Sequence, residues 1–306
     1  GRDARPRHAR SGGDGAAARP PRGRERRMKL RLYHHRDGAR VAYREAGVGP
    51  GLCLVHSAAL SHREFAPLVE HLADRFRLVL PDLPLHGDSE DRPRHPYTQE
   101  WLAEVMAAFC RETCGPHPLV GGHGAGAEIL LRATVTGQLS PARLVLMPNR
   151  LHRPPTRSRL QVPVRAVAPA AALPGLDRAA SRVVRLVYRP EHGMKLTARG
   201  NPTARDLLRH ATSDVAGNAN LARSWSRWVR RWPAGAQSDL LEAYARIEAP
   251  VLLLWADHDR YHPLIGAEEA LDLLPDGQLR VLPGTGFLIA YDDPVGVARE
   301  LAAFCV

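Results

Sequence analysis

The sequence predicts an α/β fold in which a mostly parallel sheet is covered by helices on both faces. From Met28 onward, short apolar runs that are typical of buried strands alternate with amphipathic segments of helical periodicity. The alternation stops near residue 150, gives way to a long segment rich in arginine and interrupted by prolines, and resumes near residue 246. Alternating strands and helices favour a parallel sheet, because parallel strands are joined by helical crossovers.

Six strands and three helices are expected before residue 150. The strands are Lys29–His35, Arg40–Glu45, Leu52–His56, Phe76–Leu80, Pro118–Gly121 and Leu144–Met147. The helices are His62–Arg75, Tyr97–Thr113 and Gly126–Thr136. The first two strands are expected to form a hairpin across Arg36-Asp37-Gly38.

Two further strands and two helices complete the predicted core. They are Val251–Trp255 and Leu279–Leu282 as strands, and Ala267–Leu274 and Pro294–Phe304 as helices. The predicted organisation is therefore a tail (1–27), a core (28–149 and 246–306) and a helical cap, or lid (150–245), in which no strand is expected.

One predicted helix of the cap is strongly two-sided. Trp225, Trp228 and Trp232 fall on one face, and the other face carries four arginines, Arg223, Arg227, Arg230 and Arg231. We expect this helix to pack on the core. An aromatic wall that lines a ligand pocket is the alternative, and the two overlap, because a lid packs over a cleft.

The net charge of +11 is concentrated in two segments. Residues 1–27 hold nine arginines against three acidic residues, and residues 150–249 hold 18 lysines and arginines against seven, so the remainder is net negative. A general nucleic-acid binder carries an organised basic patch within a recognisable module, so nucleic acid is not an expected partner. The basic cap instead favours a small ligand that is anionic or polar.

The tail consists mainly of Arg, Gly, Ala and Pro without apolar periodicity, so we expect it to be disordered. The folded protein is expected to begin near Met28, with the tail as sequence upstream of it. A nucleic-acid-binding arm is the alternative interpretation of these residues.

Composition predicts an ordinary globular protein, with 44% hydrophobic and 25% charged residues. No apolar run reaches the length of about 18 residues that spans a bilayer, and no signal-peptide pattern is present. The four cysteines, Cys53, Cys110, Cys114 and Cys305, lack the spacing of a zinc site. We therefore expect reduced thiols in a cytoplasmic protein, with no metal, no cofactor and no membrane contact.

The most informative motif is Gly122-His123-Gly124-Ala125-Gly126, which follows an apolar run and opens a predicted helix. This is the context of the G-x-S-x-G nucleophile elbow, in which small flanking residues let the backbone lift the central side chain above the sheet. Here the central residue is Gly124, which has no side chain to lift.

Four other motifs occur in the order and spacing of one known family. They are Leu54-Val55-His56-Ser57; Asp82-Leu83-Pro84-Leu85-His86-Gly87-Asp88-Ser89; Ala256-Asp257-His258-Asp259-Arg260; and Gly284-Thr285-Gly286-Phe287 followed by Asp292 and Pro294. Together with the elbow they resemble the α/β-hydrolase superfamily over residues 28–306. The resemblance is to its lidded branch of epoxide hydrolases, haloalkane dehalogenases and small esterases.

The resemblance implies a nucleophile (Ser or Asp), a His that takes a proton, and an acid that orients the His. It assigns these roles to Gly124, Phe287 and Asp259 in turn. Two of the three are therefore lost, and Asp259 is expected to have no His to orient. The glycine leaves open whether the lost nucleophile was Ser or Asp.

The resemblance also implies an oxyanion hole made by the backbone N–H groups of Ala58 and Ala125, which the substitutions leave in place. Ser57 lies beside this site as a candidate substitute nucleophile, and Trp225 and Trp228 are candidates for contact with a ligand.

Three histidines are candidate substitute bases. His56 and His86 lie on loops that approach the cleft mouth, and His123, within the elbow, is expected to have a structural role beside the strand. A further group, Asp257, His258, Asp259 and His262, has metal-ligand chemistry. We interpret that group as a solvated turn rather than a metal site.

These observations favour a pseudoenzyme of the family that binds a small molecule or a partner without triad hydrolysis. One alternative is a non-hydrolytic enzyme (lyase, cyclase or isomerase) that uses the oxyanion pocket and a histidine base. A second alternative is a weak ester or epoxide hydrolase with a relocated nucleophile such as Ser57.

Overall fold

The computed structural model describes residues 28–89, 94–156, 166, 168–179, 182, 189–216 and 219–306. The tail predicted to be disordered, residues 1–27, lies outside these residues. No helix in the described part of the chain is both long and apolar enough to cross a bilayer. All four cysteines are free thiols, and three of them are buried.

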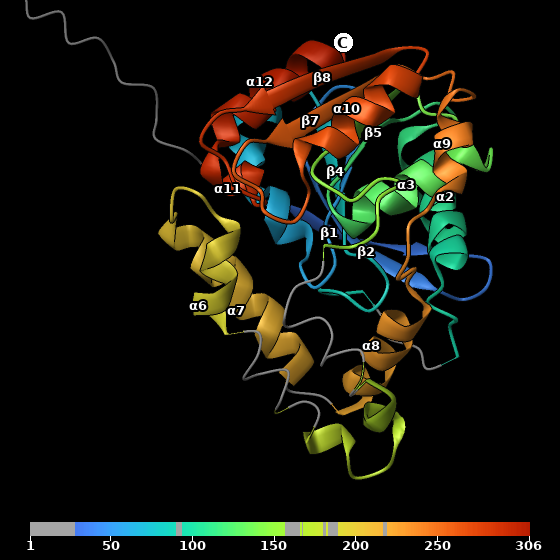
Figure 1. Ribbon diagram of the computed structural model, residues 1–306, viewed down its shortest axis with the longest axis vertical. Coiled ribbons are helices and arrows are strands. Elements are labelled where there is room, and N and C mark those ends of the chain that lie inside the picture. The colour runs from blue at the N-terminus through green and yellow to red at the C-terminus, as the bar shows by residue number, and fades with distance from the viewer. Residues whose placement is uncertain are drawn as a thin grey trace, which may run out of the picture.

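Eight strands form one sheet in the order β1-β2-β4-β3-β5-β6-β7-β8 (Figure 1). They are β1 (Lys29–His34), β2 (Arg40–Ala46), β3 (Gly51–Val55), β4 (Arg77–Pro81), β5 (Leu119–Gly122), β6 (Arg143–Leu146), β7 (Val251–Ala256) and β8 (Gly277–Leu282). The opening hairpin makes β1 and β2 antiparallel, and the pairs from β4 to β8 are parallel. The predicted mostly parallel sheet is confirmed.

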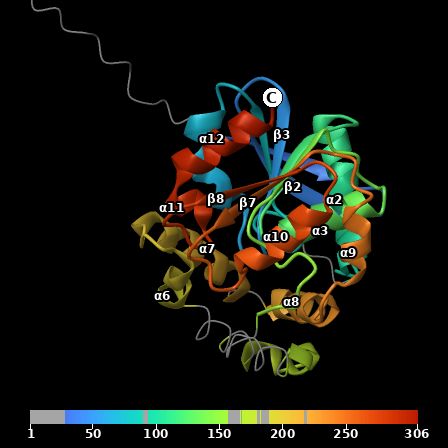
Figure 2. The same ribbon diagram turned by 45° about the horizontal axis from the view of Figure 1, so that its top comes forward.

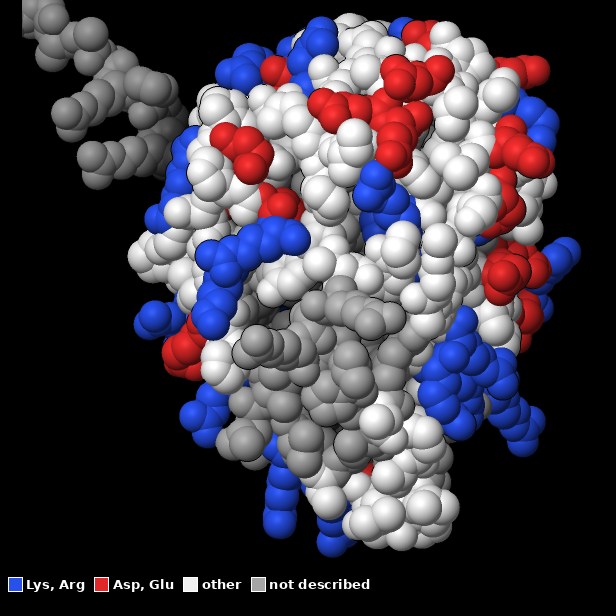
Figure 3. Space-filling model, viewed as in Figure 1, with Lys and Arg blue, Asp and Glu red and all other residues white. Residues whose placement is uncertain are grey.

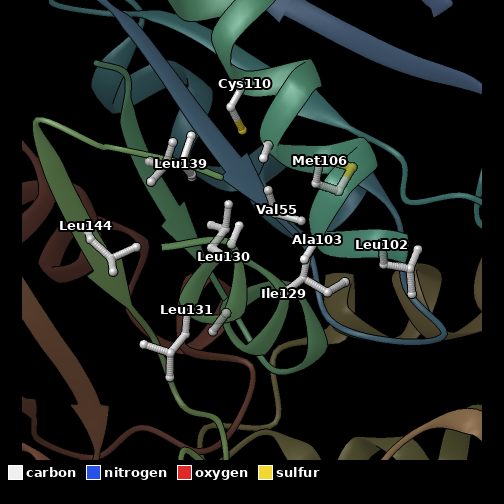
Figure 4. Close-up of a cluster of buried hydrophobic side chains, with 14 of the residues drawn as sticks. Val55, Leu102, Ala103, Met106, Cys110, Ile129, Leu130, Leu131, Leu139 and Leu144 are labelled. Atoms are coloured by element: carbon white, nitrogen blue, oxygen red, sulfur yellow. The ribbon is translucent and has the colours of Figure 1, made fainter. Parts of the chain in front are cut away.

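Helices cover both faces of the sheet. One face carries α2 (Gln99–Cys114), α3 (Ala125–Val135), α9 (Asp239–Tyr244) and α10 (Leu264–Leu273), and the other carries η1 (His62–Leu68), α1 (Val69–Leu72), α11 (Ile289–Asp292) and α12 (Pro294–Phe304). Figure 4 shows how Val55 of β3, Met106 of α2 and Ile129 of α3 gather in the apolar layer beneath the first group. This packing fixes the strand β5 and the helix α3, whose junction is the elbow.

The expectation of one helix over His62–Arg75 is wrong in form. A 3-10 helix, η1, runs into a single α-helical turn, α1. Pro67 lies inside η1 and has no N–H to donate, which does not favour a continuous α-helical ladder there. The shape matters because it directs His62 and Glu64, both buried, back toward the loops at the ends of β3 and β4.

We call residues 150–245, between β6 and β7, the insert. The regular elements described within it are all helical: η2 (Ala168–Ala172), α6 (Pro190–Gly193), η3 (Met194–Leu196), α7 (Pro202–Ala216), α8 (Ala219–Arg231) and α9. Figures 1 and 2 show α6, α7 and α8 together on one side of the core. No strand occurs in the described part of the insert.

Candidate active site

The elbow has the backbone that the motif predicts. β5 ends at Gly122, α3 begins at Ala125, and Gly124 between them has φ 53° and ψ −125°, a conformation that L residues rarely adopt. A Cβ atom on Gly122 would lie 2.6 Å from the amide nitrogen of Ala127, and one on Gly126 would collide with the carbonyl oxygen of Val55. The flanking glycines are therefore required by close backbone approach.

The space above Gly124 is filled by two other residues. A Cβ atom added to Gly124 would lie 2.6 Å from Cβ of Ser57 and 3.3 Å from Cζ of Phe287. Carbon atoms ordinarily separate by about 3.5–4.0 Å, so a nucleophile could not be added here without moving Ser57. The space that a side chain at position 124 would need is therefore occupied by Ser57 and Phe287.

Phe287, which the sequence analysis places at the position of the family's histidine, takes part in a stack of rings. Its ring lies 4.1 Å, centroid to centroid, from that of His123 and 5.1 Å from that of His262, with interplanar angles of 29° and 28°. Phe287 is only partly buried, so this stack is reachable from solvent at one side.

Asp259 has an imidazole partner, which corrects the expectation that it has none. His262 Nδ1 lies 2.8 Å from Asp259 Oδ2, and the other carboxylate oxygen accepts the backbone N–H of Tyr261. Burial opposes ionisation of Asp259, but the hydrogen bond and charge of His262 outweigh it and hold the pKa of the carboxyl below its usual range. The sequence missed His262 in this role, although its i+3 spacing from Asp259 on one turn was a usable signal.

The interpretation of residues 257–262 as a solvated turn is half right. Asp257 and His258 pair with each other on the surface, with 33% and 64% of their side chains exposed. The side chain of Asp259 is fully buried and 17% of the His262 side chain is exposed, so these two side chains face inward.

Glu64 is a site residue that sequence reasoning did not identify. Its buried carboxylate accepts the backbone N–H of Ser57 at 2.8 Å and the Ser57 hydroxyl at 3.3 Å, and it pairs with Nδ1 of His123. Burial opposes ionisation, but the charge of His123 and these hydrogen bonds hold the pKa of Glu64 below its usual range. His123 is buried and its Nε2 has no hydrogen-bond partner.

His56 and His86, two of the candidate bases, are committed to backbone groups through both ring nitrogens. His56 bonds the Ser57 carbonyl at 2.8 Å and the Leu83 N–H at 2.9 Å, and His86 bonds the Pro84 carbonyl and the Ala59 N–H, each at 3.0 Å. Burial and the neighbouring His56 lower the pKa of His86 to about 3, and burial lowers the pKa of His56. This geometry holds the loops after β3 and β4 together and does not favour proton transfer.

The backbone N–H groups of Ala58 and Ala125, which the sequence analysis predicts as oxyanion donors, make no hydrogen bond within the described residues. Ala58 is exposed and Ala125 is partly buried. Ala125 is the first residue of α3, where backbone N–H groups carry the positive end of the helix dipole. The two amides flank the place where Ser57 and Gly124 meet.

The tryptophan face of α8 packs against the core. The ring of His86 lies 4.7 Å from that of Trp225 and 5.1 Å from that of Trp228, and Trp228 is buried. Trp232 stacks on Trp228 and donates its indole N–H to Glu128 at 3.0 Å. These contacts are those of a helix packed on the core, which was the favoured interpretation of the sequence. Trp225 is only partly buried where it lies beside His86, on the loop after β4.

Beneath Trp232, Glu128 and Arg150 form a buried ion pair with an Nε–Oε1 distance of 2.8 Å. Arg150 also donates to the Pro233 carbonyl, shortly after the end of α8, and its second terminal nitrogen has no hydrogen-bond partner. Burial raises the pKa of Glu128 in spite of the nearby guanidinium. The pair therefore ties the insert to the first turn of α3.

A group with metal-ligand chemistry, His62, Asp82 and Asp88, lies beneath the loop after β4. Asp82 is already bonded to the ring and N–H of His62 and to the N–H of Asp88, and Asp88 pairs with Arg44 at 2.7 Å. Each carboxylate is thus used in holding the turn. In that turn Leu85 replaces the family's glycine and keeps a glycine-like φ of 79°.

The sequence matches the α/β hydrolase fold family over residues 50–294. The chain belongs to this family. It is 30% identical over 263 residues to a pimeloyl-[acyl-carrier protein] methyl ester esterase of Xanthomonas campestris pv. campestris, covering 78% of this chain and 88% of the relative. It is 27% identical over 260 residues to the magnesium-chelatase 30 kDa subunit of Rhodobacter capsulatus, covering 79% and 81%.

A solved α/β hydrolase fold protein from Burkholderia ambifaria superposes with a TM-score of 0.73 at 22% identity, over 90% of this chain and 100% of that one. This likeness shows the fold alone. The predicted α/β-hydrolase fold is confirmed by the family match and by this superposition.

Proposed function

We propose that this α/β-hydrolase does not cleave esters or epoxides through the family's triad and instead binds a small molecule between the core and the insert. The observation that carries the proposal is the filled space above Gly124, where Ser57 and Phe287 occupy the place of a nucleophile. The unpartnered amides of Ala58 and Ala125 would hold a carbonyl or carboxylate oxygen of the ligand.

The basic character of the insert supports an anionic or polar ligand. Figure 3 shows Lys and Arg side chains around the end of the molecule where the insert lies, while carboxylates gather over the core. The magnesium-chelatase relative is named as a subunit. This name supports a variant of the proposal in which the chain binds a protein partner without triad hydrolysis.

Hydrolysis by Ser57 is the less favoured candidate, although one relative is named as an esterase. A serine nucleophile needs a neighbouring base to take its proton. The group that Ser57 touches is Glu64, whose lowered pKa makes it a weak base. A second candidate function, non-hydrolytic proton transfer, is favoured by the two imidazoles beside Phe287, each of which is held by a carboxylate.

The test is steady-state turnover of p-nitrophenyl acetate and styrene oxide by the native chain and by Asp259→Asn. We expect both proteins to remain at the uncatalysed rate, because loss of triad members lowers the rate of hydrolysis by several orders of magnitude. Turnover by the native chain that disappears in Asp259→Asn contradicts it. Binding is then measured with a panel of aryl carboxylates as a rise in Tm, with Ala125→Pro, which lacks the amide donor at a helix position that tolerates proline, as the matched variant.

A further inference from the structure

His262 lies beside the place of the missing nucleophile. Phe287 comes within 3.3 Å of a Cβ atom on Gly124, and the ring of His262 stacks on Phe287 at 5.1 Å. The imidazole is thus separated from the elbow by a single ring. It comes from the turn after β7, whereas the family's histidine would come from position 287 itself.

The hydrogen bond to Asp259 fixes which nitrogen of His262 is basic. The pKa of Asp259 is below its usual range, so the carboxylate is ionised at neutral pH and accepts hydrogen bonds without donating them. His262 Nδ1 must therefore donate to it, and a neutral imidazole then has a lone pair at Nε2. That nitrogen has no hydrogen-bond partner within the described part of the chain, and the buried carboxylate of Glu128 lies near enough to act on the imidazole electrostatically.

Exposure separates His262 from the other imidazole of the stack. The side chain of His123 is 1% exposed, its buried Nε2 is out of reach of solvent, and its ring stacks on that of Phe287. The side chain of His262 is 17% exposed, so part of the imidazole reaches solvent with the stack in place. His258, on the same loop, pairs with Asp257 at the surface and offers a matched histidine outside the site.

We infer that His262, oriented by Asp259, is the proton-transfer group of this site and acts on a ligand with an acidic C–H next to a carbonyl. The inference rests on the second candidate function proposed above. In the step, the C–H bond breaks and its proton goes to Nε2 of His262. The electron pair forms the C=C bond of an enolate, and the carbonyl π electrons move to the oxygen at the amides of Ala58 and Ala125.

The probe is 5-nitrobenzisoxazole, which reports an accessible base in a site of this kind. A base removes its C–H proton, the electron pair forms a nitrile, and the N–O bond breaks to release a coloured phenolate. The rate is measured for the native chain and for five variants: His262→Gln, His262→Ala, Asp259→Asn, His123→Gln and His258→Gln. Circular dichroism and Tm are measured for each, so that a variant that fails to fold is recognised.

The native chain is expected to accelerate the elimination, and His262→Gln to lose about 100-fold or more of that acceleration, as removal of a general base does. Asp259→Asn is expected to lose activity as well, and His258→Gln to keep it. Exogenous imidazole is expected to restore part of the activity of His262→Ala, which a purely structural role would not allow.

A native rate equal to background overturns the inference, as does a loss that follows His123→Gln and not His262→Gln. If the chain does hydrolyse esters or epoxides, contrary to the proposed function, that result would be seen separately as ester or epoxide turnover. The two failures are therefore distinguishable.

Discussion

The replacement Gly124→Ala tests whether the nucleophile's place is filled. The left-handed φ of 53° costs an L residue about 1–3 kcal/mol, whatever space is available. The new Cβ would also lie 2.6 Å from Cβ of Ser57, and overpacking of this kind costs about 1–3 kcal/mol. We therefore expect Gly124→Ala to lower the free energy of unfolding by about 2–6 kcal/mol.

The two contributions are separated by a double-mutant cycle with Ser57→Gly, using urea unfolding followed by tryptophan fluorescence. Removal of the Ser57 side chain relieves its contact with the new Cβ but not the backbone strain at position 124. The loss of stability caused by Gly124→Ala should therefore be about 1–3 kcal/mol smaller in the Ser57→Gly background. Gly137→Ala is the matched control, because Gly137 has φ 74° and nothing within 4 Å of an added Cβ. A Gly124→Ala cost no larger than that of Gly137→Ala, with no coupling to Ser57→Gly, refutes the reasoning.

Three further predictions concern stability. The pKa of His86 is about 3 in the folded state against an ordinary 6.5, so below pH 6.5 the unfolded state binds more protons than the folded state. The free energy of unfolding should therefore fall by up to about 1.4 kcal/mol per pH unit as the pH drops from 6.5 toward 4. His86→Asn should flatten this slope, as measured by urea unfolding at several pH values. Glu64→Gln should cost about 3–5 kcal/mol at pH 7 by leaving a buried partner unpaired. Because the folded pKa of Glu64 is lowered, the difference should shrink in acid as the carboxylate protonates, and a pH-independent difference would count against the pairing. Arg150→Met should lower the free energy of unfolding by about 3–5 kcal/mol, because it leaves the buried Glu128 unpaired. The double variant with Glu128→Met should recover most of that lost stability, whereas additive losses from the two substitutions would contradict a direct ion pair.

The elements of the fold could be predicted because each has a local signal. Strands and helices of the core, such as β7 and α12, are marked by apolar periodicity and turn residues, and the glycines of the elbow by the close approach of backbones. The form of the segment after Ser61 could not be predicted in this way. Its apolar spacing suits an α-helix, but Pro67 within it accompanies a 3-10 helix.

The site was only partly predictable, since its chemistry depends on contacts between distant segments. Motif order alone led to the prediction that Gly124 and Phe287 stand at the nucleophile and histidine positions. The pairing of Glu64 with His123, 59 residues apart, has no local pattern. The pairing of His262 with Asp259 could not be predicted either, because Asp257 and Asp259 look alike in sequence. Only the side chain of Asp259 is buried in the folded chain, where it contacts His262.

The central claim, that this chain has no working nucleophile, is tested most directly by labelling with a fluorophosphonate. Such reagents bond covalently to activated serines whatever the natural substrate. The native chain is incubated beside a triad-bearing esterase, and both are measured by intact mass spectrometry. The account predicts labelling of the esterase and an unchanged mass for this chain, whereas a stoichiometric adduct on Ser57 would contradict it.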